Sequence, residues 1–495
     1  MSTPAASARR EGELDAVGGN GSRAAAARES SRALEPALED GEPTLLTGWG
    51  RTAPTLASVH RPADAGQVTE LMARSRARGV IARGLGRAYG DAAQNAGGRV
   101  LSLLDVRGVR SFDPETGVIT VGAGLSIGDL ARLVLPHGWF PPVLPGTSHV
   151  TVGGAIAADI HGKNHHREGS FCDHVRSLEL VRAGGERLTV TPGGTSEVFA
   201  ATAGGMGLTG VVVEATLQLL GVETDRVRVD TERARNLDDV MERMERGDES
   251  YRYSVAWIDC LARGRALGRS VLMRGDHATP QELSPGGRTA AAGGFSPPRM
   301  LSAPPGLPSG LLSTPALRAF NEVYFRRSPR HEHGRLEALH SYFHPLDVVG
   351  DWNRLYGPRG LLQYQLVVPF GAESTLREVV ERLAAARAPA FLAVLKRFGG
   401  GRGMLSFPIP GWTLTMDLPA GRRELAPLLD DLDELVVGAG GRLYLAKDSR
   451  LRPELLEAMY PELGRWREVQ ARLDPQGALR SDLGRRLGLG GGSKR

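Results

Sequence analysis

Hydrophobic and polar positions follow two different periods in the first half of the chain. Stretches with apolar residues at every second position predict short strands at 55–61, 79–84, 108–124 (two strands around a Pro-Glu-Thr-Gly turn) and 177–192 (a hairpin with Gly-Gly at its tip). A helical period predicts helices from Asp64 to Arg78, closed by Gly79, and from Ser126, its N-cap, to Pro136–Gly138. Hairpins mixed with crossovers favour an α+β fold over a doubly wound sheet.

The second half has longer alternating runs. Residues 252–261, 361–370 and 412–419 predict strands of one antiparallel sheet, with a helix at 374–387 among the connecting segments. Residues 275–315 are rich in Pro, Gly and Ser without periodicity, which predicts a mobile loop. Residues 1–43 lack aromatic residues and are predicted to be a disordered tail.

Composition narrows the function classes. The net charge of +5 is spread over 61 basic and 56 acidic residues without a long run of either sign, so nucleic acid is not an expected partner. Two cysteines, Cys172 and Cys260, have no zinc or disulfide spacing. Without an apolar run of 18 residues or a secretory signal, we expect a cytoplasmic protein or one peripheral at the inner membrane, with the periplasmic side left open.

Lysine is rare in this chain. Of the 61 basic residues only four are lysines: Lys163, Lys396, Lys447 and Lys494. A bias toward arginine codons explains the scarcity, but under such a bias lysine persists where a compact ammonium or a proton-releasing amine is needed. Lys494 lies in a polar tail, so the first three are the functional candidates.

Four glycine-rich turns crowd the predicted first domain, at 83–91, 121–124, 144–154 and 204–210. Glycines let backbone N–H groups converge on an anion, and a helix that begins near Thr151 would direct its positive end at a diphosphate. The turn at 83–91 has the spacing G-x-G-x-x-x-G, which differs from the Rossmann fingerprint. The pattern therefore predicts a large diphosphate cofactor held by several loops.

A group of histidines lies between His161 and His174. His161 and His165 have an i, i+4 spacing, but Gly162 and Asn164 disfavour a helix there and no HExxH glutamate is present. We therefore predict no metal site, and the missing G-x-S-x-G elbow argues against a nucleophilic serine.

Several motifs carry a resemblance to a known family. They are "LTGWGRTAP" (46–54), "ARGLGRAYGD" (82–91), "PVLPGTSHVTVGGAIAADIHGKNHH" (142–166), "GLTGVVVEATL" (207–217), "YFHPLD" (342–347), "LLQYQLVVP" (361–369), "SFPIPGW" (406–412) and "RLYLAKDSR" (442–450). In this order the chain resembles the flavoprotein subunits of decaprenylphosphoryl-β-D-ribose 2'-oxidases, which are vanillyl-alcohol-oxidase-type FAD-linked oxidoreductases. The resemblance runs from about residue 44 to 488.

The resemblance implies a division into domains. It predicts a PCMH-type FAD-binding domain at 44–224, an inserted antiparallel-sheet substrate domain at 225–441, and a C-terminal segment, 442–490, that returns to the FAD domain. Many FAD enzymes of this class bond the flavin covalently to a histidine in the first glycine loop. Arg87 stands at that position here, so we expect FAD without a covalent bond.

The resemblance also assigns roles by position. The implied catalytic residues are Lys447, Tyr89 and His161, with Lys447 either stabilising reduced flavin or acting as a base. The implied cofactor-binding residues are Ala82, Arg83, Gly84, Leu85, Gly86, Arg87, Ala88, Tyr89, Gly90, Asp91, Gly146, Thr151, Val152, Gly153, Gly154, Ala158, Asp159, Ile160, His161, Gly207, Val212 and Tyr444. The implied substrate contacts are Lys163, Trp257, Gln363, Gln365, Lys396, Thr413 and Thr415.

One strand departs from the family pattern. Mycobacterial members read Gly-Trp-Asn-x-Cys where this chain reads Gly411-Trp412-Thr413-Leu414-Thr415, so the substrate contacts there differ and the thiol that covalent nitroaromatic inhibitors trap is missing.

The expected reaction is oxidation of the 2'-hydroxyl of a polyprenylphosphoryl-β-D-ribose to the 2'-keto sugar, the first half of an epimerisation to the arabinose form. The expected partners are the lipid-linked phosphopentose, an NADH-dependent keto-reductase and a membrane surface. Two alternatives remain open: an FAD oxidase of a soluble sugar, polyol or nucleoside, and a non-catalytic flavin-binding protein. Oxygen and a quinone both remain open as the electron acceptor.

Overall fold

The computed structural model describes residues 41–74, 78–283, 294–295, 301–308, 310 and 312–490. Residues 1–40 of the predicted tail and most of residues 284–311 in the predicted loop lie outside this range. The described ends of the predicted loop belong to ordered elements: β14 runs to His277 and α8 begins at Thr314.

Three main sheets build the molecule. A four-stranded sheet has the order β1 (Glu42–Leu46), β2 (Thr55–His60), β4 (Arg99–Ser102), β3 (Val80–Arg83), and a five-stranded sheet has the order β5 (Val109–Asp113), β6 (Val118–Gly122), β10 (Val211–Gln218), β8 (Val175–Val181), β9 (Arg187–Val190). The eight-stranded sheet has the order β16 (His331–Ala338), β12 (Arg226–Ala234), β14 (Ser270–His277), β13 (Tyr253–Ile258), β19 (Ala393–Phe398), β20 (Gly411–Pro419), β18 (Leu361–Pro369), β21 (Arg442–Leu443). Parallel pairs of β4 with β2 and β3 and antiparallel pairs elsewhere in these sheets confirm the α+β class.

Helices cover these sheets. In the first half they are α2 (Ala65–Ala73), α3 (Ile127–Val134), α4 (Val152–Ala157), α5 (His165–Glu168) and α6 (Ser196–Thr202). In the second half they are α7 (Leu237–Gly247), α8 (Thr314–Arg327), α9 (Leu339–Phe343), α10 (Glu373–Ala385), α11 (Leu425–Gly438), α12 (Leu456–Met459), α13 (Leu463–Leu473) and α14 (Asp482–Leu487). The predicted cap of α3 is confirmed, since the Ser126 hydroxyl accepts a backbone N–H group at its start. The helix predicted from Asp64 to Arg78 begins as expected, with Asp64 as its N-cap, but α2 ends at Ala73.

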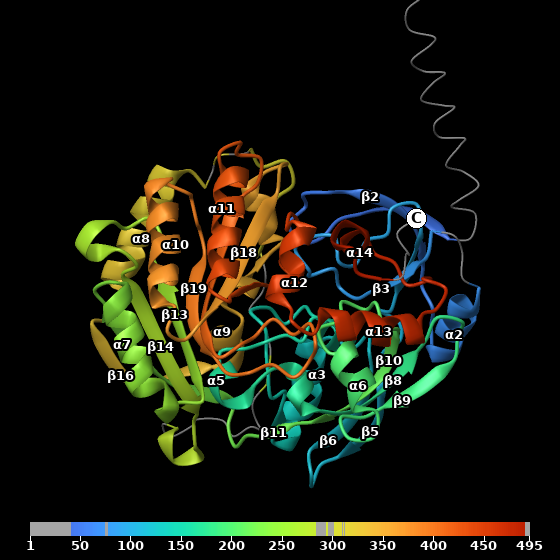
Figure 1. Ribbon diagram of the computed structural model, residues 1–495. Helices are drawn as coiled ribbons and strands as arrows, with labels where there is room; N and C mark the ends of the chain where they lie inside the picture. The colour runs from blue at the N-terminus through green and yellow to red at the C-terminus, as the bar shows by residue number, and fades with distance from the viewer. Residues whose placement is uncertain are drawn as a thin grey trace, which may run out of the picture.

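The chain ends beside its beginning. Figure 1 shows the red helices α13 and α14 among the blue and green elements of the first half, away from α7, α8, α10 and α11. The Arg486 guanidinium lies 2.8 Å from a carboxylate oxygen of Asp91 and 2.9 Å from one of Asp448. Leu479 forms a bridge with Val80 at the edge of β3. The last described residues therefore pack against the elements at the start of the described chain.

The eight-stranded sheet has one apolar face and one partly polar face. Side chains alternate along a strand, so Tyr364 and Leu366 of β18 point into the core beneath α10 and α11, while Gln363 and Gln365 point the other way. The same alternation on β19 buries Leu395 and turns its neighbour Lys396 to the opposite face. This polar face forms one wall of the cavity described next.

Candidate active site

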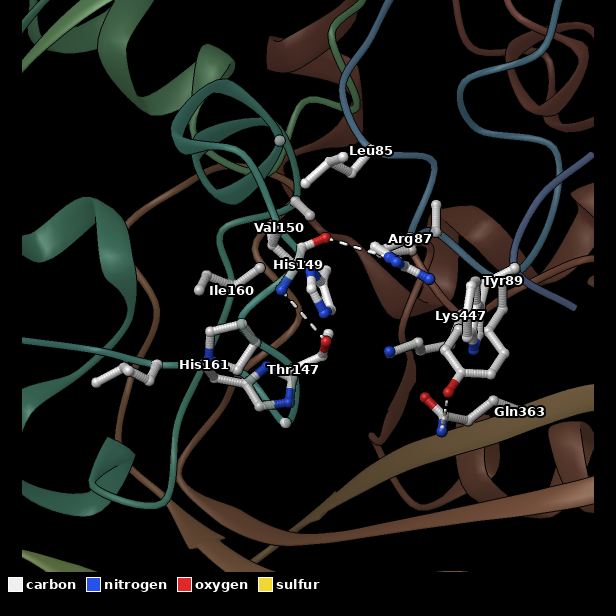
Figure 2. A pocket seen from close by; sticks show the side chains of 18 of the residues that line it. Leu85, Arg87, Tyr89, Thr147, His149, Val150, Ile160, His161, Gln363 and Lys447 are labelled. Carbon is white, nitrogen blue, oxygen red and sulfur yellow. Dashed lines mark hydrogen bonds between the residues drawn. The ribbon is translucent and has the colours of Figure 1, made fainter. Parts of the chain in front are cut away.

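A cavity of about 540 Å³ lies between the polar face of the large sheet and the glycine-rich loops of the first half. This volume is in the range of small-molecule and cofactor sites. Figure 2 shows Lys447 beside Tyr89, extending toward the open centre of the cavity, with His161 across from them. Side chains from the loops at 82–89 and 144–163 and from β13, β18 and β19 therefore face one space.

The first glycine loop is a wall of this cavity, and part of it carries free donors. The backbone N–H groups of Leu85, Gly86, Arg87 and Ala88 donate to no acceptor in the described part of the chain, and neither do those of Gly146 and Thr147 in the third glycine loop. Unpaired backbone donors at a cavity wall are the groups that bind a phosphate. Gly90 follows where the chain must pass closely, because a Cβ there would lie 1.9 Å from the carbonyl oxygen of Asp448.

Arg87 connects two of the loops. Its guanidinium carbon lies 3.9 Å from the centroid of the Trp49 ring, a cation–π contact, and its Nε donates to the carbonyl oxygen of His149 at 3.3 Å. An arginine in this position offers no nucleophilic ring nitrogen to a cofactor.

Most of the predicted site residues line this cavity. They are Ala82, Arg83, Gly84, Leu85, Gly86, Arg87, Ala88, Tyr89, Gly146, Thr151, Gly153, Gly154, Ala158, Ile160, His161, Lys163, Gly207, Val212, Trp257, Gln363, Gln365, Lys396, Thr415, Tyr444 and Lys447. The five that do not line it are Gly90, Asp91, Val152, Asp159 and Thr413.

The five residues behind the wall hold its elements in place. Asp91 pairs with Arg486, and Val152 is fully buried in the core at the start of α4. Asp159, with φ of 40°, accepts hydrogen bonds from the Cys172 backbone N–H and the Ser406 hydroxyl.

Three lysines converge on the cavity, and their environment disfavours charge. Burial lowers the pKa of Lys163 to about 8, although Glu337 opposes the shift. Burial, with repulsion from the other two ammonium groups, lowers the pKa of Lys396 to about 7. Burial lowers the pKa of Lys447 to about 8 against the attraction of Asp417. Lys163 donates to the carbonyl oxygen of Tyr342, so one of the three already has a protein partner.

Gln363 links Tyr89 to a buried carboxyl group. Its Nε2 donates to the Tyr89 hydroxyl at 3.0 Å and to Oδ1 of Asp417 at 2.5 Å. Asp417 is fully buried, and burial raises the pKa of its carboxyl group to about 7. Burial also raises the pKa of Tyr89 well above its usual value, so the phenol keeps its proton.

His161 is held as a neutral ring. Its Nε2 lies 2.9 Å from Nε2 of Gln365, and because an amide nitrogen only donates, this ring nitrogen accepts. The proton is then on Nδ1, which has no partner among the described residues. Burial lowers the pKa of His161 well below its usual value. The second Gln365 contact is the Thr413 hydroxyl at 3.3 Å.

Sequence reasoning missed several residues of this site. Trp49, Thr147, His149, Asp347 and Trp352 line the cavity without having been assigned to it. All of them except Trp352 fall in motifs quoted above, which was the available signal. Asp417 could have been found from the period of β20, since it follows Thr413 and Thr415 at every second position.

Comparison with known proteins shows the family to which the chain belongs. It is 42% identical over 450 residues to a decaprenylphosphoryl-β-D-ribose oxidase of Mycolicibacterium smegmatis, covering 90% of this chain and 97% of that protein. The chain belongs to this oxidase family. Residues 56–191 match the FAD binding domain family, so the protein is an FAD-linked oxidoreductase.

Two further relatives are similar to shorter parts of the chain. An uncharacterised protein from the mprA 5' region of Streptomyces coelicolor is 46% identical over 370 residues, 73% of this chain and 99% of that protein. An alditol oxidase of Streptomyces is 33% identical over 178 residues, 36% of this chain and 42% of its own length.

The cavity fits the cofactor that the FAD binding domain implies. The unpaired N–H groups at Leu85–Ala88 and Gly146–Thr147 can bind a diphosphate. The buried Nδ1–H of His161 lacks an acceptor that a cofactor or substrate atom can supply.

Among the described helices, none combines the length and the apolar character that a bilayer crossing requires.

Proposed function

We propose that this protein oxidises the 2'-hydroxyl of a polyprenylphosphoryl-β-D-ribose, of the decaprenylphosphoryl-ribose type, to the 2'-keto sugar. The reaction is the first half of an epimerisation to the arabinose form. The observation that carries this proposal is the convergence of Lys163, Lys396 and Lys447 on one cavity, in a chain with almost no other lysine. With pKa values of about 7 to 8 these lysines stay partly protonated near neutral pH, and their ammonium forms match an anionic substrate such as a phosphorylated sugar.

FAD is proposed to bind without a covalent bond. The residues that would hold it are the cavity-lining members of the first glycine loop, the segment from Gly146 to His161, Gly207, Val212 and Tyr444. When bound, FAD supplies the two-electron acceptor that oxidation of an alcohol requires.

The chain's own groups handle the hydroxyl proton. With a pKa of about 8, Lys447 is partly neutral near physiological pH, and its free amine accepts the proton as carbon loses hydrogen. His161 cannot take this role at Nε2, which accepts from Gln365, so it donates from Nδ1 and orients the ligand. Tyr89 stays protonated and, with its oxygen receiving the Gln363 amide, offers its O–H as a donor.

Substrate selection is assigned to the polar face of the sheet. Lys163 and Lys396 attract the phosphate, and Trp257, Gln363, Gln365 and Thr415 surround the sugar. Thr413 acts behind them, because its hydroxyl donates to the Leu366 carbonyl at 2.8 Å and accepts from Gln365.

The product defines the expected partner. A 2'-keto sugar becomes the arabinose form only by reduction, so we propose an NADH-dependent keto-reductase as the second enzyme. Because the proposed substrate is lipid-linked, we propose that the protein works in the cytoplasm or peripherally at the inner membrane, with the periplasmic side left open.

Isotopic substitution tests the reaction assigned to the site. A polyprenylphosphoryl-ribose with deuterium at C2' is expected to reduce the bound flavin several-fold more slowly than the undeuterated compound, since the C2'–H bond breaks in this step. Equal rates for C2'-deuterated substrate and a slower rate for substrate deuterated at C3' would move the oxidation to another carbon.

The second candidate is an FAD oxidase of a soluble sugar, polyol or nucleoside. The alditol oxidase relative and the threonines at 413 and 415 favour it. Turnover of free pentoses or alditols at rates equal to or above those with the lipid-linked compound would select this candidate.

A further inference from the structure

Two histidines and an aspartate form a buried cluster beside the main cavity. His340 and His344 lie one helical turn apart, at and just after α9, and the His344 N–H donates to the His340 carbonyl at 2.9 Å. Asp347 follows in the next turn, which spans Pro345–Val348. One ligand atom from each of the three side chains lies within 4.8 Å of the other two.

The ring nitrogens of these two histidines have no hydrogen-bond partners in the described part of the chain. Nδ1 and Nε2 of both rings are buried without one, and the residues are 3% and 0% exposed. Buried polar atoms are almost always paired, with protein, water or an ion. Both rings form T-shaped contacts with Phe295, with centroid separations of 5.3 and 5.7 Å, so an apolar group packs against them.

We propose that His340, His344 and Asp347 bind a divalent first-row transition metal ion of the Zn²⁺ type. Two imidazoles and a carboxylate are a ligand set for zinc, and three protein ligands leave the fourth position to solvent or another group. The sequence predicted no metal site because only the histidines between His161 and His174 were considered. The metal site proposed here is independent of the substrate proposed above.

The position of Asp347 gives the ion a structural role. One carboxylate oxygen of Asp347 accepts from the Ser148 backbone N–H and hydroxyl, both at 2.7 Å. Asp347 and Thr147 also line the main cavity. An ion at the cluster would therefore fix the segment 339–347 against the third glycine loop and hold that loop in its cavity-lining position.

Metal analysis of the tag-free holoenzyme tests the site. After dialysis against Zn²⁺ and removal of free ion, we expect about one equivalent of zinc per chain by mass spectrometry, and a higher midpoint of thermal unfolding than after chelation. Titration with Co²⁺ is expected to give the visible absorption of a four-coordinate ion. A wild-type protein that takes up no zinc and gives no cobalt spectrum overturns the proposal, whatever the variants do.

Variants locate the ion. His340→Gln and His344→Gln are each expected to weaken zinc affinity by about 100-fold or more, while flavin content confirms that each variant folds. The matched control is the His331→Gln/His333→Gln double variant, because that exposed pair, with ring centroids 4.0 Å apart, is the place where adventitious zinc would bind. Zinc lost in the control and retained in the two single variants contradicts the site.

Discussion

Nζ of Lys447 lies 4.3 Å from the centroid of the Tyr89 ring, over its face. The two residues come from distant parts of the chain, and the Tyr89 backbone N–H donates to the carbonyl of Ala446, the residue before Lys447. The first glycine loop and the "AKDSR" segment are therefore hydrogen-bonded to each other at the place where the Lys447 amine enters the cavity. This pair is the centre of the proposed chemistry.

Removal of the Lys447 amine separates catalysis from cofactor binding. In Lys447→Met we expect FAD content to stay normal while substrate-dependent flavin reduction slows by about 100-fold or more, because the proton acceptor is gone. Rapid mixing without oxygen measures the rate. The matched control is Lys494→Met, which changes the lysine outside the described residues and is expected to leave the rate unchanged. Full turnover by Lys447→Met would contradict the assignment of Lys447 as the proton acceptor.

The depressed lysine pKa values make the stability of the cofactor-free protein depend on pH. Lys396 is neutral above about pH 7 in the folded state but binds a proton up to about 10.5 when unfolded, so the unfolded state holds the extra proton and stability rises with pH across this window. Each such lysine contributes at most about 1.4 kcal/mol per pH unit. Urea unfolding between pH 8 and 10 is expected to give a slope lower by about that amount in Lys396→Met. An unchanged slope means that Lys396 stays charged.

The affinity for substrate is expected to change with pH in the opposite direction to the stability of the cofactor-free protein. A phosphate is attracted only by protonated lysines, so affinity is expected to fall as the pH rises from about 7 through 9, the range in which Lys163, Lys396 and Lys447 lose their protons. Titration of the oxidised enzyme with an unreactive 2'-deoxy phosphosugar lipid measures this. Affinity that is flat or rises with pH would argue against phosphate recognition by these lysines.

Asp417 tunes the proposed base. Its carboxylate raises the pKa of Lys447, so Asp417→Asn is expected to move the acidic limb of the flavin reduction profile to lower pH by about 0.5 to 1 unit. Asparagine keeps an oxygen acceptor for the Gln363 amide, which preserves the contact to Tyr89. The control is Asp431→Asn, an exposed residue of α11. A lower rate with no shift of the limb would give Asp417 a packing role only.

We expect the protein to form no covalent bond with its flavin and none with a nitroaromatic inhibitor. Acid precipitation is expected to release all flavin into the supernatant, because the resemblance assigns Arg87 to the position of the covalent histidine. A nitroaromatic inhibitor is expected to leave the intact mass unchanged, since Thr415 lines the cavity and both cysteines, Cys172 and Cys260, are buried. The Thr415→Cys variant is expected to gain the adduct. Flavin on the pellet, or an adduct on the wild type, contradicts these expectations.

Local patterns were sufficient for much of the fold. Period-two alternation located β13, β18 and β20. The helical period located the start of α2, and the cap at Ser126 located α3, since these signals depend on near neighbours. Sequence does not state which strands are neighbours. The order of the eight-stranded sheet, and the return of β21 to pair with β18, result from packing of segments far apart in the chain.

The sequence likewise predicted only part of the candidate site. Rarity singled out the three lysines, and the structure brings them to one cavity. Gly90 and Asp159 were assigned to cofactor binding because they belong to motifs whose other members line the cavity, although both lie behind its wall. Asp347 and Asp417 were missed because their importance depends on partners, Ser148 and Gln363, from distant segments.

The reduction of the bound flavin without oxygen tests the central claim most directly. The oxidised holoenzyme is mixed anaerobically with polyprenylphosphoryl-β-D-ribose, free ribose, ribose 5-phosphate, alditols and nucleosides, and loss of the flavin's visible absorption is followed. The account predicts rapid, stoichiometric bleaching by the polyprenylphosphoryl-ribose and bleaching that is slower by orders of magnitude with the free compounds. Bleaching by a free sugar or alditol at an equal or higher rate, or no bleaching by the lipid-linked sugar, would contradict it.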